Sequence, residues 1–157
     1  MKGLHEDGIK KPIYVIASDT LVETPVIVQR IDSTLARIND VARREKLPFS
    51  AHKVQPIIKD SFWVNLIGKG YPAPNSKFRW CTERLKINPA NRFILDKANQ
   101  HGEVIVVLGV RKAESTTRAQ VMSLYRREGS RLSRHSQLPN AYVYPAVEDW
   151  SVKDVWT

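Results

Sequence analysis

Short apolar runs alternate along the chain with longer segments in which apolar residues recur every three or four positions. The runs, at residues 13–17, 49–57, 104–108 and 141–145, contain many Val, Ile and Tyr and end in polar or turn residues, which is typical of strands. A helix is predicted after the first run, beginning near Pro25, because five apolar residues share one of its faces: Val28, Ile31, Leu35, Ile38 and Val41. This alternation of strands and helices predicts an α/β fold with a mostly parallel sheet.

Four further segments show weaker helical patterns. Residues 61–67 predict a short helix ended by Gly68 and Gly70, and residues 117–128 are helical in tendency. Asn88 and Pro89 can start a helix that stops at Gly102, and residues 151–154 resemble a capping box that opens a last helix. The polar stretches at residues 70–79 and 129–140 are expected to be loops.

The strand predicted at residues 104–108 is followed by a basic, hydroxyl-rich loop that suits an anion. Val104–Leu108 reads as a buried strand, and Gly109 ends it. In an open α/β sheet, ligands bind beyond the carboxyl ends of the strands. The side chains expected there suit a phosphate group: Arg111, Lys112, Ser115, Thr116 and Arg118.

The loop at residues 18–24 follows the first predicted strand and carries two carboxylates and three hydroxyls. A carboxylate such as that of Asp19 can accept a hydrogen bond from a ribose hydroxyl or an adenine amino group. The alternative is that Asp19 and Thr24 only form the turn and cap the next helix.

Cys81 is the only cysteine of the chain, so neither an internal disulfide nor a complete zinc or iron–sulfur site can form from this sequence alone. Arg79, Arg84 and Lys86 surround it, and nearby cations favour the reactive thiolate. The alternative is a buried structural cysteine that packs beside Trp80.

Positive charge is concentrated in two segments of a chain whose net charge is +9. Residues 111–135 hold seven Lys or Arg against two Glu, and residues 77–86 hold four against one. Clustered basic residues attract polyanions such as nucleic acid, although a merely solvated basic surface is the alternative. No apolar run is long enough to span a bilayer and no signal peptide is evident, so we expect a cytoplasmic protein without a membrane partner.

Four sequence blocks together resemble the phosphoadenosine-phosphosulfate-reductase-like branch of the adenine nucleotide α-hydrolase (PP-loop) superfamily: ASDTLVETP, KFRWCTERLKINP, LGVRKAESTTR and EDWSVKDVW. The pattern Gly-x-Arg-x-x-Glu-Ser at residues 109–115 is similar to the second phosphate-side loop of that family. The resemblance implies a Rossmann-like, mostly parallel sheet flanked by helices.

Longer stretches are similar to DndC, the sulfurtransferase family of DNA phosphorothioation systems: DSFWVNLIGKGYPAPNSKFRWCTERLKI, RKAESTTRA and LSRHSQLPNAYVYPAVEDWS. This resemblance implies an ATP pyrophosphatase that activates a DNA backbone phosphate by adenylylation, so that sulfur can replace oxygen. It further implies ATP with magnesium, an iron–sulfur cluster, a cysteine desulfurase as sulfur donor, DNA, and other subunits of the phosphorothioation complex.

The same resemblance suggests roles for individual residues. Ser18, Asp19 and Thr20 are expected near the adenosine, and Gly109 is expected to let the backbone approach the phosphates. The phosphate pocket would be shaped by Arg111, Glu114 and Ser115, and the charge developed in catalysis would be balanced by Arg111 and Arg118. Glu114 could bind magnesium, but a salt bridge to Arg118 is the alternative that we favour. Cys81 would be a cluster ligand or a persulfide-carrying thiol.

Two features of the family have no counterpart in the sequence. The sequence does not contain the Ser-Gly-Gly-x-Asp-Ser pyrophosphate loop that follows the family's first strand. Of the cluster cysteines only Cys81 has a match, and the others are expected mostly beyond residue 157. We therefore expect residues 1–157 to form a single, partial nucleotide-binding domain that lacks the first strand and is inactive alone. The alternatives are a reductase of the phosphoadenosine-phosphosulfate type and a non-catalytic remnant that binds nucleic acid.

Overall fold

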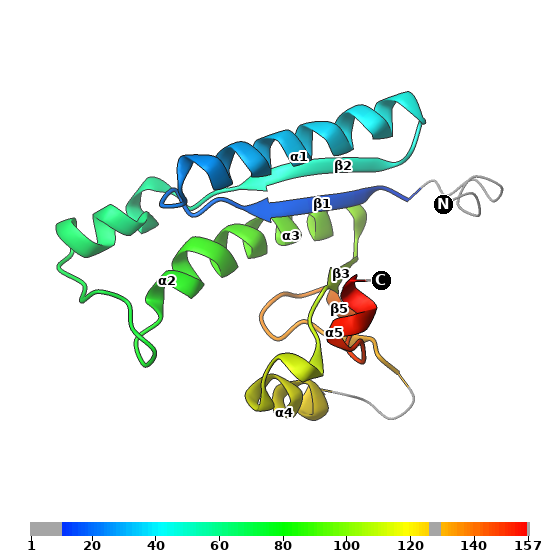
Figure 1. The fold of residues 1–157 in the computed structure, drawn as a ribbon. Helices are drawn as coiled ribbons and strands as arrows, with labels where there is room; N and C mark the ends of the chain where they lie inside the picture. Colours follow the sequence, from blue (N-terminus) through cyan, green and yellow to red (C-terminus); the bar gives the residue numbers. More distant parts are fainter. Residues whose placement is uncertain (1–10, 126–129, 157) are drawn as a thin grey trace. The chain divides into compact units, whose positions relative to one another are not determined.

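The computed structural model describes residues 11–125 and 130–156, and it has an α/β fold in which strands alternate with helices (Figure 1). The chain divides into two compact units. The first ends at Ala90 and the second begins at Asn91. Among the described residues, no helix is long and apolar enough to cross a membrane.

The first unit begins with a strand–helix–strand motif. Strand β1 (Ile13–Ser18) and strand β2 (Phe49–Val54) are parallel, with Ile13 opposite Phe49 and Ser18 opposite Val54. Helix α1 (Pro25–Arg44) connects them and lies along the sheet, packed against β2 (Figure 1). All three elements were predicted, because Pro at the start of α1 and the apolar spacing along it both favour a helix.

A side-chain amide of α1 covers the outer edge of β2. Asn39 donates from Nδ2 to the carbonyl of Ala51 at 3.0 Å, and its Oδ1 accepts from the backbone N–H of Ala51 at 2.7 Å. The pair satisfies both backbone groups of a buried strand residue, as a further strand would. Leu35 and Ala42 of α1 and Val54 of β2 complete this core.

After β2 the first unit consists of helical turns and loops, and its last helix continues past Ala90 into the second unit. A short 3-10 helix, η2 (Ile58–Asp60), precedes the region where a short helix was predicted, and a π-helical turn, η3 (Val64–Gly68), lies in that region. A continuous helical segment then runs through α2 (Trp80–Thr82), the π-helical turn η4 (Glu83–Ile87) and α3 (Asn88–His101). The predicted start at Asn88 is therefore too late. Pro89 has no backbone N–H to donate, and a widened turn immediately before it lets the helix continue through the proline.

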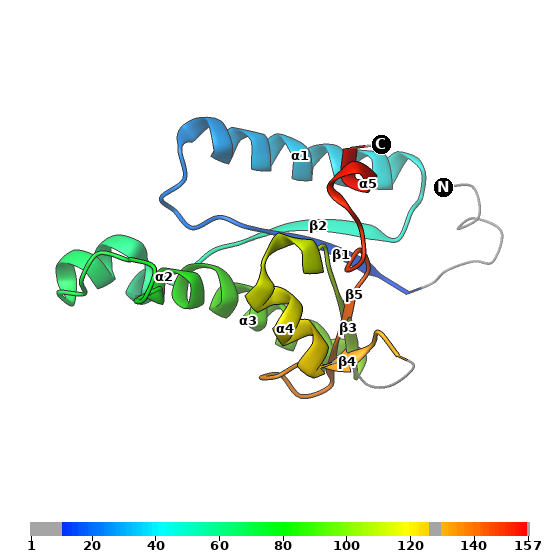
Figure 2. The same cartoon turned by 60° about the horizontal axis from the view of Figure 1, so that its bottom comes forward.

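The second unit contains the other sheet, in the order β3-β5-β4. Strand β3 (Val104–Leu108) is parallel to β5 (Ala141–Pro145), and the short β4 (Ser133–Arg134) is antiparallel to β5 (Figure 2). The 3-10 helix η5 (Lys112–Glu114) and helix α4 (Thr116–Tyr125) follow β3, and α5 (Val152–Trp156) follows β5. Strand β4 lies in a segment that was predicted to be a loop.

Two expectations about the sheet need correction. The described strands form two sheets instead of one: β1 pairs with β2, and β3, β5 and β4 pair with one another. Among the described residues, no strand joins the two sheets by backbone hydrogen bonds. Strand β3 is not buried on both sides, since Ile105 is 59% and Val107 is 63% exposed while Val104 and Val106 are half-buried. Alternating exposure of this kind is typical of a sheet with one covered face.

Candidate functional site

The residues predicted to form the site fall into two groups, one in each unit. The first unit holds Ser18, Asp19, Thr20 and Cys81, and the second holds Gly109, Arg111, Glu114 and Ser115. Arg118 lies on α4, but its side chain is outside the described part of the structure.

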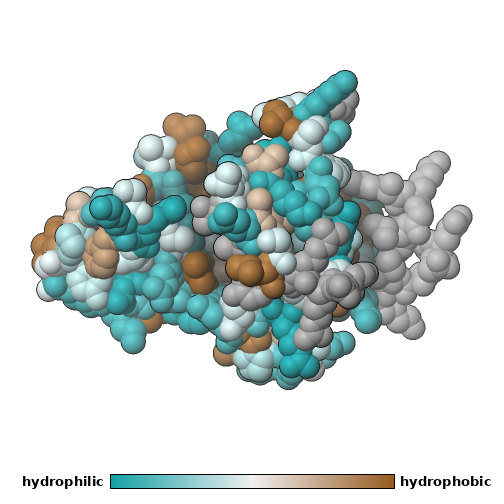
Figure 3. Space-filling model, turned by 90° about the horizontal axis from the view of Figure 1, so that it is seen from below, coloured by the Kyte–Doolittle hydropathy of each residue, from teal (hydrophilic) through white to brown (hydrophobic). Residues whose placement is uncertain are grey.

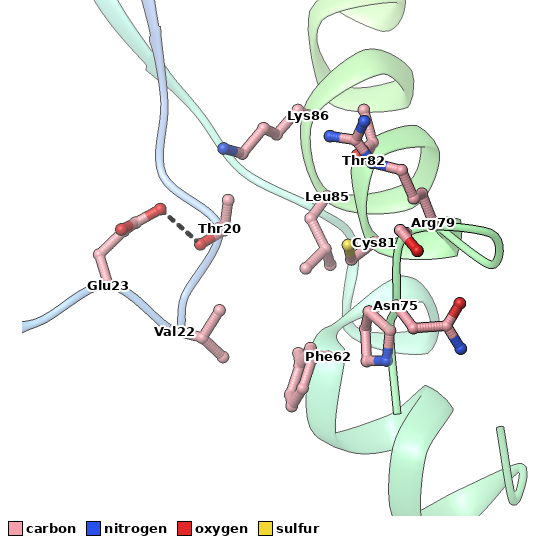
Figure 4. A pocket seen from close by; sticks show the side chains of 12 residues that line it. Thr20, Val22, Glu23, Phe62, Asn75, Arg79, Cys81, Thr82, Leu85 and Lys86 are labelled. Atoms are coloured by element: carbon pink, nitrogen blue, oxygen red, sulfur yellow. Dashed lines mark hydrogen bonds between the residues drawn. The ribbon is translucent and has the colours of Figure 1, made fainter. Parts of the chain in front are cut away.

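A cavity of about 570 Å³ in the first unit brings Thr20 and Cys81 together. Its walls come from the loop after β1, from Phe62, from the loop at residues 74–79 and from the helical segment that carries Cys81. In Figure 4 the sulfur of Cys81 and the side chain of Leu85 point from the helix toward Val22 and Thr20 on the opposite wall. The sequence therefore identified residues from two distant stretches that share one pocket.

An aromatic cluster fixes the helical turn that presents Cys81. Trp80 is 6% exposed, stacks on Phe62 with 5.5 Å between ring centroids and meets Tyr71 edge-on at 5.6 Å. Its Nε1 donates to the carbonyl of Pro72 at 3.0 Å, so the buried indole N–H is satisfied. Cys81 itself is only half-buried, so it is not the fully buried structural cysteine that was the alternative.

Of the three cationic residues near Cys81 in the sequence, Arg84 makes its contacts with residues that do not line the cavity. Arg84 donates to Asp60 Oδ1 at 3.1 Å and to the Tyr71 hydroxyl at 2.9 Å. Arg79 and Lys86 line the cavity with Cys81, and both are exposed. The positive charge of the pocket therefore comes from these two residues.

Cys81 does not form a metal centre with its neighbours. Within residues 11–125 and 130–156, no group of three or more His, Cys, Asp or Glu side chains lies close enough to hold a metal ion. An iron–sulfur cluster needs several thiolate ligands, and this chain supplies one. This chain by itself therefore supplies one of the ligands that such a cluster needs.

Asp19 is buried at the carboxyl end of β1 and is held by protein donors. Its Oδ1 accepts from the Leu21 backbone N–H and its Oδ2 from the Gln55 side chain, both at 2.9 Å. Burial acts to raise the pKa of Asp19, but these two hydrogen bonds and the charge of Lys53, 3.7 Å away, outweigh it and lower the pKa overall. Asp19 therefore forms the turn that the alternative described.

Of the three predicted residues Ser18, Asp19 and Thr20, it is Thr20 that lines the cavity. It is 3% exposed, and its hydroxyl donates to Glu23 Oε1 at 2.9 Å (Figure 4). Glu23 also lines the cavity and was not among the predicted site residues, although it lies in the same polar loop. Ser18 ends β1 opposite Val54, and Thr24 makes no side-chain cap to α1.

In the second unit, the loop after β3 presents a half-buried guanidinium group, that of Arg111. Arg111 Nε lies 3.5 Å from Glu114 Oε1, and Arg111 Nη1 is buried without a hydrogen-bond partner among the described residues. Gly109 precedes it with open space where a Cβ would stand. Ser115 directly precedes α4, and its carbonyl accepts from the Ala119 N–H at 3.0 Å.

A network of charges that the sequence did not reveal holds the same loop. Glu148 is 4% exposed, and its Oε1 lies 3.6 Å from Lys112 Nζ and 3.5 Å from Arg131 Nε. Asp149 pairs with the same two cations at 2.8 and 3.0 Å, and the Lys112 N–H donates to the Glu148 carbonyl at 2.9 Å. The place of Glu148 and Asp149 in the sequence could have identified them as candidates. They follow β5, and because β5 is parallel to β3, the carboxyl ends of the two strands lie at the same edge of the sheet.

Comparison with known proteins gives one distant relative and no family. No protein-family model matches the chain. The chain is 30% identical over 149 residues to an uncharacterized protein, MJ0066, of Methanocaldococcus jannaschii, and the aligned part covers 95% of this chain and 26% of that protein. The chain therefore spans about a quarter of the length of this relative.

Proposed function

We propose that this chain is the nucleotide-binding part of an ATP-dependent sulfurtransferase of the DndC type, which modifies the DNA backbone with phosphorothioate. The proposal includes a Rossmann-like sheet of the adenine nucleotide α-hydrolase superfamily, a cytoplasmic location, and DNA, a cysteine desulfurase and further complex subunits as partners. The resemblance described above supports these assignments, and so does the α/β fold with parallel strand pairs.

The observation that carries the proposal is Arg111 Nη1 near the carboxyl end of β3, a buried donor atom that has no hydrogen-bond partner within the described part of the chain. A buried guanidinium donor without a partner is costly, and an anionic oxygen is the acceptor that best satisfies it. Lys112 and Arg131 are neutralised by Glu148 and Asp149, so they do not compete for such an anion. With the open space beside Gly109, the loop suits a phosphate of ATP.

The chemistry assigned to the complete protein has two stages. A DNA phosphate oxygen attacks the α-phosphorus of ATP and pyrophosphate leaves. A sulfur nucleophile then attacks the DNA phosphorus, a P–S bond forms, and the activated oxygen leaves as part of AMP. Charge develops on both phosphate fragments in the first stage, and Arg111 together with Arg118 would stabilise it. Glu114 faces Arg111 at 3.5 Å, which favours an orienting ion pair over a magnesium ligand. Cys81 would carry the sulfur in its half-buried pocket as a persulfide, whose outer sulfur forms the bond to phosphorus. A second thiol would then reduce the S–S bond to Cys81 and leave the phosphorothioate on the DNA.

Nucleotide affinity tests the role of Arg111 directly. In the complete protein that contains this chain, Arg111→Ala should raise the Kd for ATP by about tenfold or more, since charge-assisted hydrogen bonds contribute about 1.5–3 kcal/mol. Arg37→Ala, at an exposed position of α1, should leave the Kd unchanged. Equal affinities of the two variants would remove Arg111 from the site.

A further inference from the structure

The loop that leads into the Cys81 helix is closed on one asparagine side chain. Asn75 Oδ1 accepts from the backbone N–H groups of Lys77 at 2.9 Å and Phe78 at 3.0 Å. The Asn75 N–H in turn donates to the carbonyl of Phe78 at 3.2 Å. These three hydrogen bonds fix the backbone conformation of residues 75–78. The backbone therefore sets the positions from which the side chains of Lys77 and Phe78 extend.

This loop presents an aromatic ring between two cations. Phe78 is 43% exposed and contacts Tyr71 with 6.4 Å between ring centroids. Lys77 and Arg79 are exposed, and neither side chain has an ion-pair or hydrogen-bond partner in the described part of the chain. The hydrogen bonds that close the turn come from Asn75 and the backbone, so the side chains of Lys77, Phe78 and Arg79 take no part in them.

The surface around the loop has the same mixed character. Figure 3 shows hydrophobic residues among hydrophilic ones at the left end of the molecule, which Figure 1 identifies as the segment between β2 and α2. Trp63 and Ile67 of this segment are 58% and 75% exposed. Single-stranded nucleic acids bind to surfaces on which bases stack on aromatic rings while nearby cations contact phosphates.

The loop also borders the cavity of Cys81. Asn75 and Arg79 line that cavity, together with Ser76, Lys86 and the thiol (Figure 4). A strand held by Phe78 and its two cations would therefore lie beside this cavity, because Arg79 belongs to both. Double-stranded DNA fits this arrangement less well, because its bases are stacked and leave no free face for Phe78.

We propose that residues 75–79 bind a nucleic-acid strand that has an unstacked base, with Phe78 stacked on the base and Lys77 and Arg79 paired with neighbouring phosphates. The inference rests on the proposed function only for the choice of DNA as the strand. It deepens that function, since it means that the substrate is recognised in a single-stranded or locally opened form. Asn75 acts as a positioning residue that orients the other three.

The test is the fluorescence anisotropy of a labelled, mixed-sequence DNA oligonucleotide, single-stranded or as a blunt duplex, titrated with the full chain over a range of salt concentrations. Phe78→Ala should weaken single-strand binding by about fivefold to a hundredfold, the range for one stacked base, without changing the salt dependence. Lys77→Ala and Arg79→Ala should each lower the slope of log K against log salt by about 0.7. Arg37→Ala should change neither quantity.

Phe78→Trp controls for a structural role of the ring, because it keeps an aromatic surface and should restore binding. The proposal is overturned if Phe78→Ala binds the single strand as well as the original chain does, or if the duplex is bound as tightly and with the same dependence on Phe78. Displacement of the oligonucleotide by polyglutamate at an equal charge concentration would overturn it too. ATP affinity measured in the same variants should not change, so a failure here is distinguishable from a failure of the nucleotide site.

Discussion

Replacement of the buried carboxylate Glu148 by an amide should destabilise the protein more than the same change at its exposed neighbour Asp149. Both acids contact Lys112 and Arg131, and Asp149 makes the shorter contacts, at 2.8 and 3.0 Å against 3.6 and 3.5 Å. Their side chains differ in exposure, which is 5% for Glu148 and 49% for Asp149. The pair of variants therefore separates the effect of burial from that of distance.

The expected loss in free energy of unfolding depends on how well the remaining charges are hydrated and paired after each substitution. Breaking a buried ion pair by removing one partner costs about 3–5 kcal/mol when the remaining charge stays buried. In the Glu148→Gln variant, Lys112 and Arg131 keep Asp149 as a partner, and their side chains are 30% and 42% exposed to water. The free energy of unfolding should therefore decrease by less than this, by about 1–2 kcal/mol. Asp149→Asn removes an exposed partner and should cost below about 0.5 kcal/mol.

Urea unfolding followed by far-ultraviolet circular dichroism measures both free energies by linear extrapolation. Glutamine preserves the volume of Glu148, so a cavity does not complicate the comparison. The reasoning is refuted if Asp149→Asn costs as much as Glu148→Gln, because contact distance would then outweigh burial. It is refuted equally if Glu148→Gln leaves the free energy of unfolding unchanged.

Three further predictions concern titratable groups. The pKa of Asp19 is lowered in the folded state, so below about pH 4 the unfolded state binds more protons, and the free energy of unfolding should decrease as the pH decreases. Asp19→Asn should flatten this part of the plot of unfolding free energy against pH. An unchanged plot would contradict the assignment. Burial lowers the pKa of His135, whose Nδ1 accepts from two backbone N–H groups at 3.2 Å, so stability should be complete above about pH 6.5 and fall below it. His135→Asn keeps an acceptor and should lose this dependence in the same measurement, whereas persistence of the step would point to another group. Cys81→Ser in the complete protein should retain ATP binding but lose sulfur incorporation into DNA, measured by mass spectrometry of digested DNA; continued incorporation would exclude Cys81.

Periodicity and capping signals in the sequence were enough to predict most of the secondary structure. The apolar spacing along α1 and the proline at its start predicted that helix, and four apolar runs predicted β1, β2, β3 and β5. The capping box was confirmed, since Asp154 accepts from the Ser151 N–H at 2.7 Å and the Asp154 N–H donates to Ser151 Oγ at 3.3 Å. These features depend on neighbours in sequence, which is why they could be predicted.

Features that depend on distant contacts could not be predicted. Trp80 starts a helix because Phe62 and Tyr71 pack around it, and nothing near Trp80 in the sequence signals this. The burial of Glu148 likewise depends on Lys112 and Arg131, which come from separate segments. The candidate site shows the same limit: Thr20 and Cys81 were each singled out, but their shared cavity emerges only from the fold.

The most direct test of the central claim is transfer of the label from ATP carrying ³²P at the α-phosphate to DNA. In the complete protein without a sulfur donor, the DNA should acquire the label as pyrophosphate is released, and addition of the donor should release the label as AMP. Arg111→Ala should lose both steps and Arg37→Ala should keep them. Unlabelled DNA, with ADP and inorganic phosphate as the products of ATP, would contradict the proposed adenylylation.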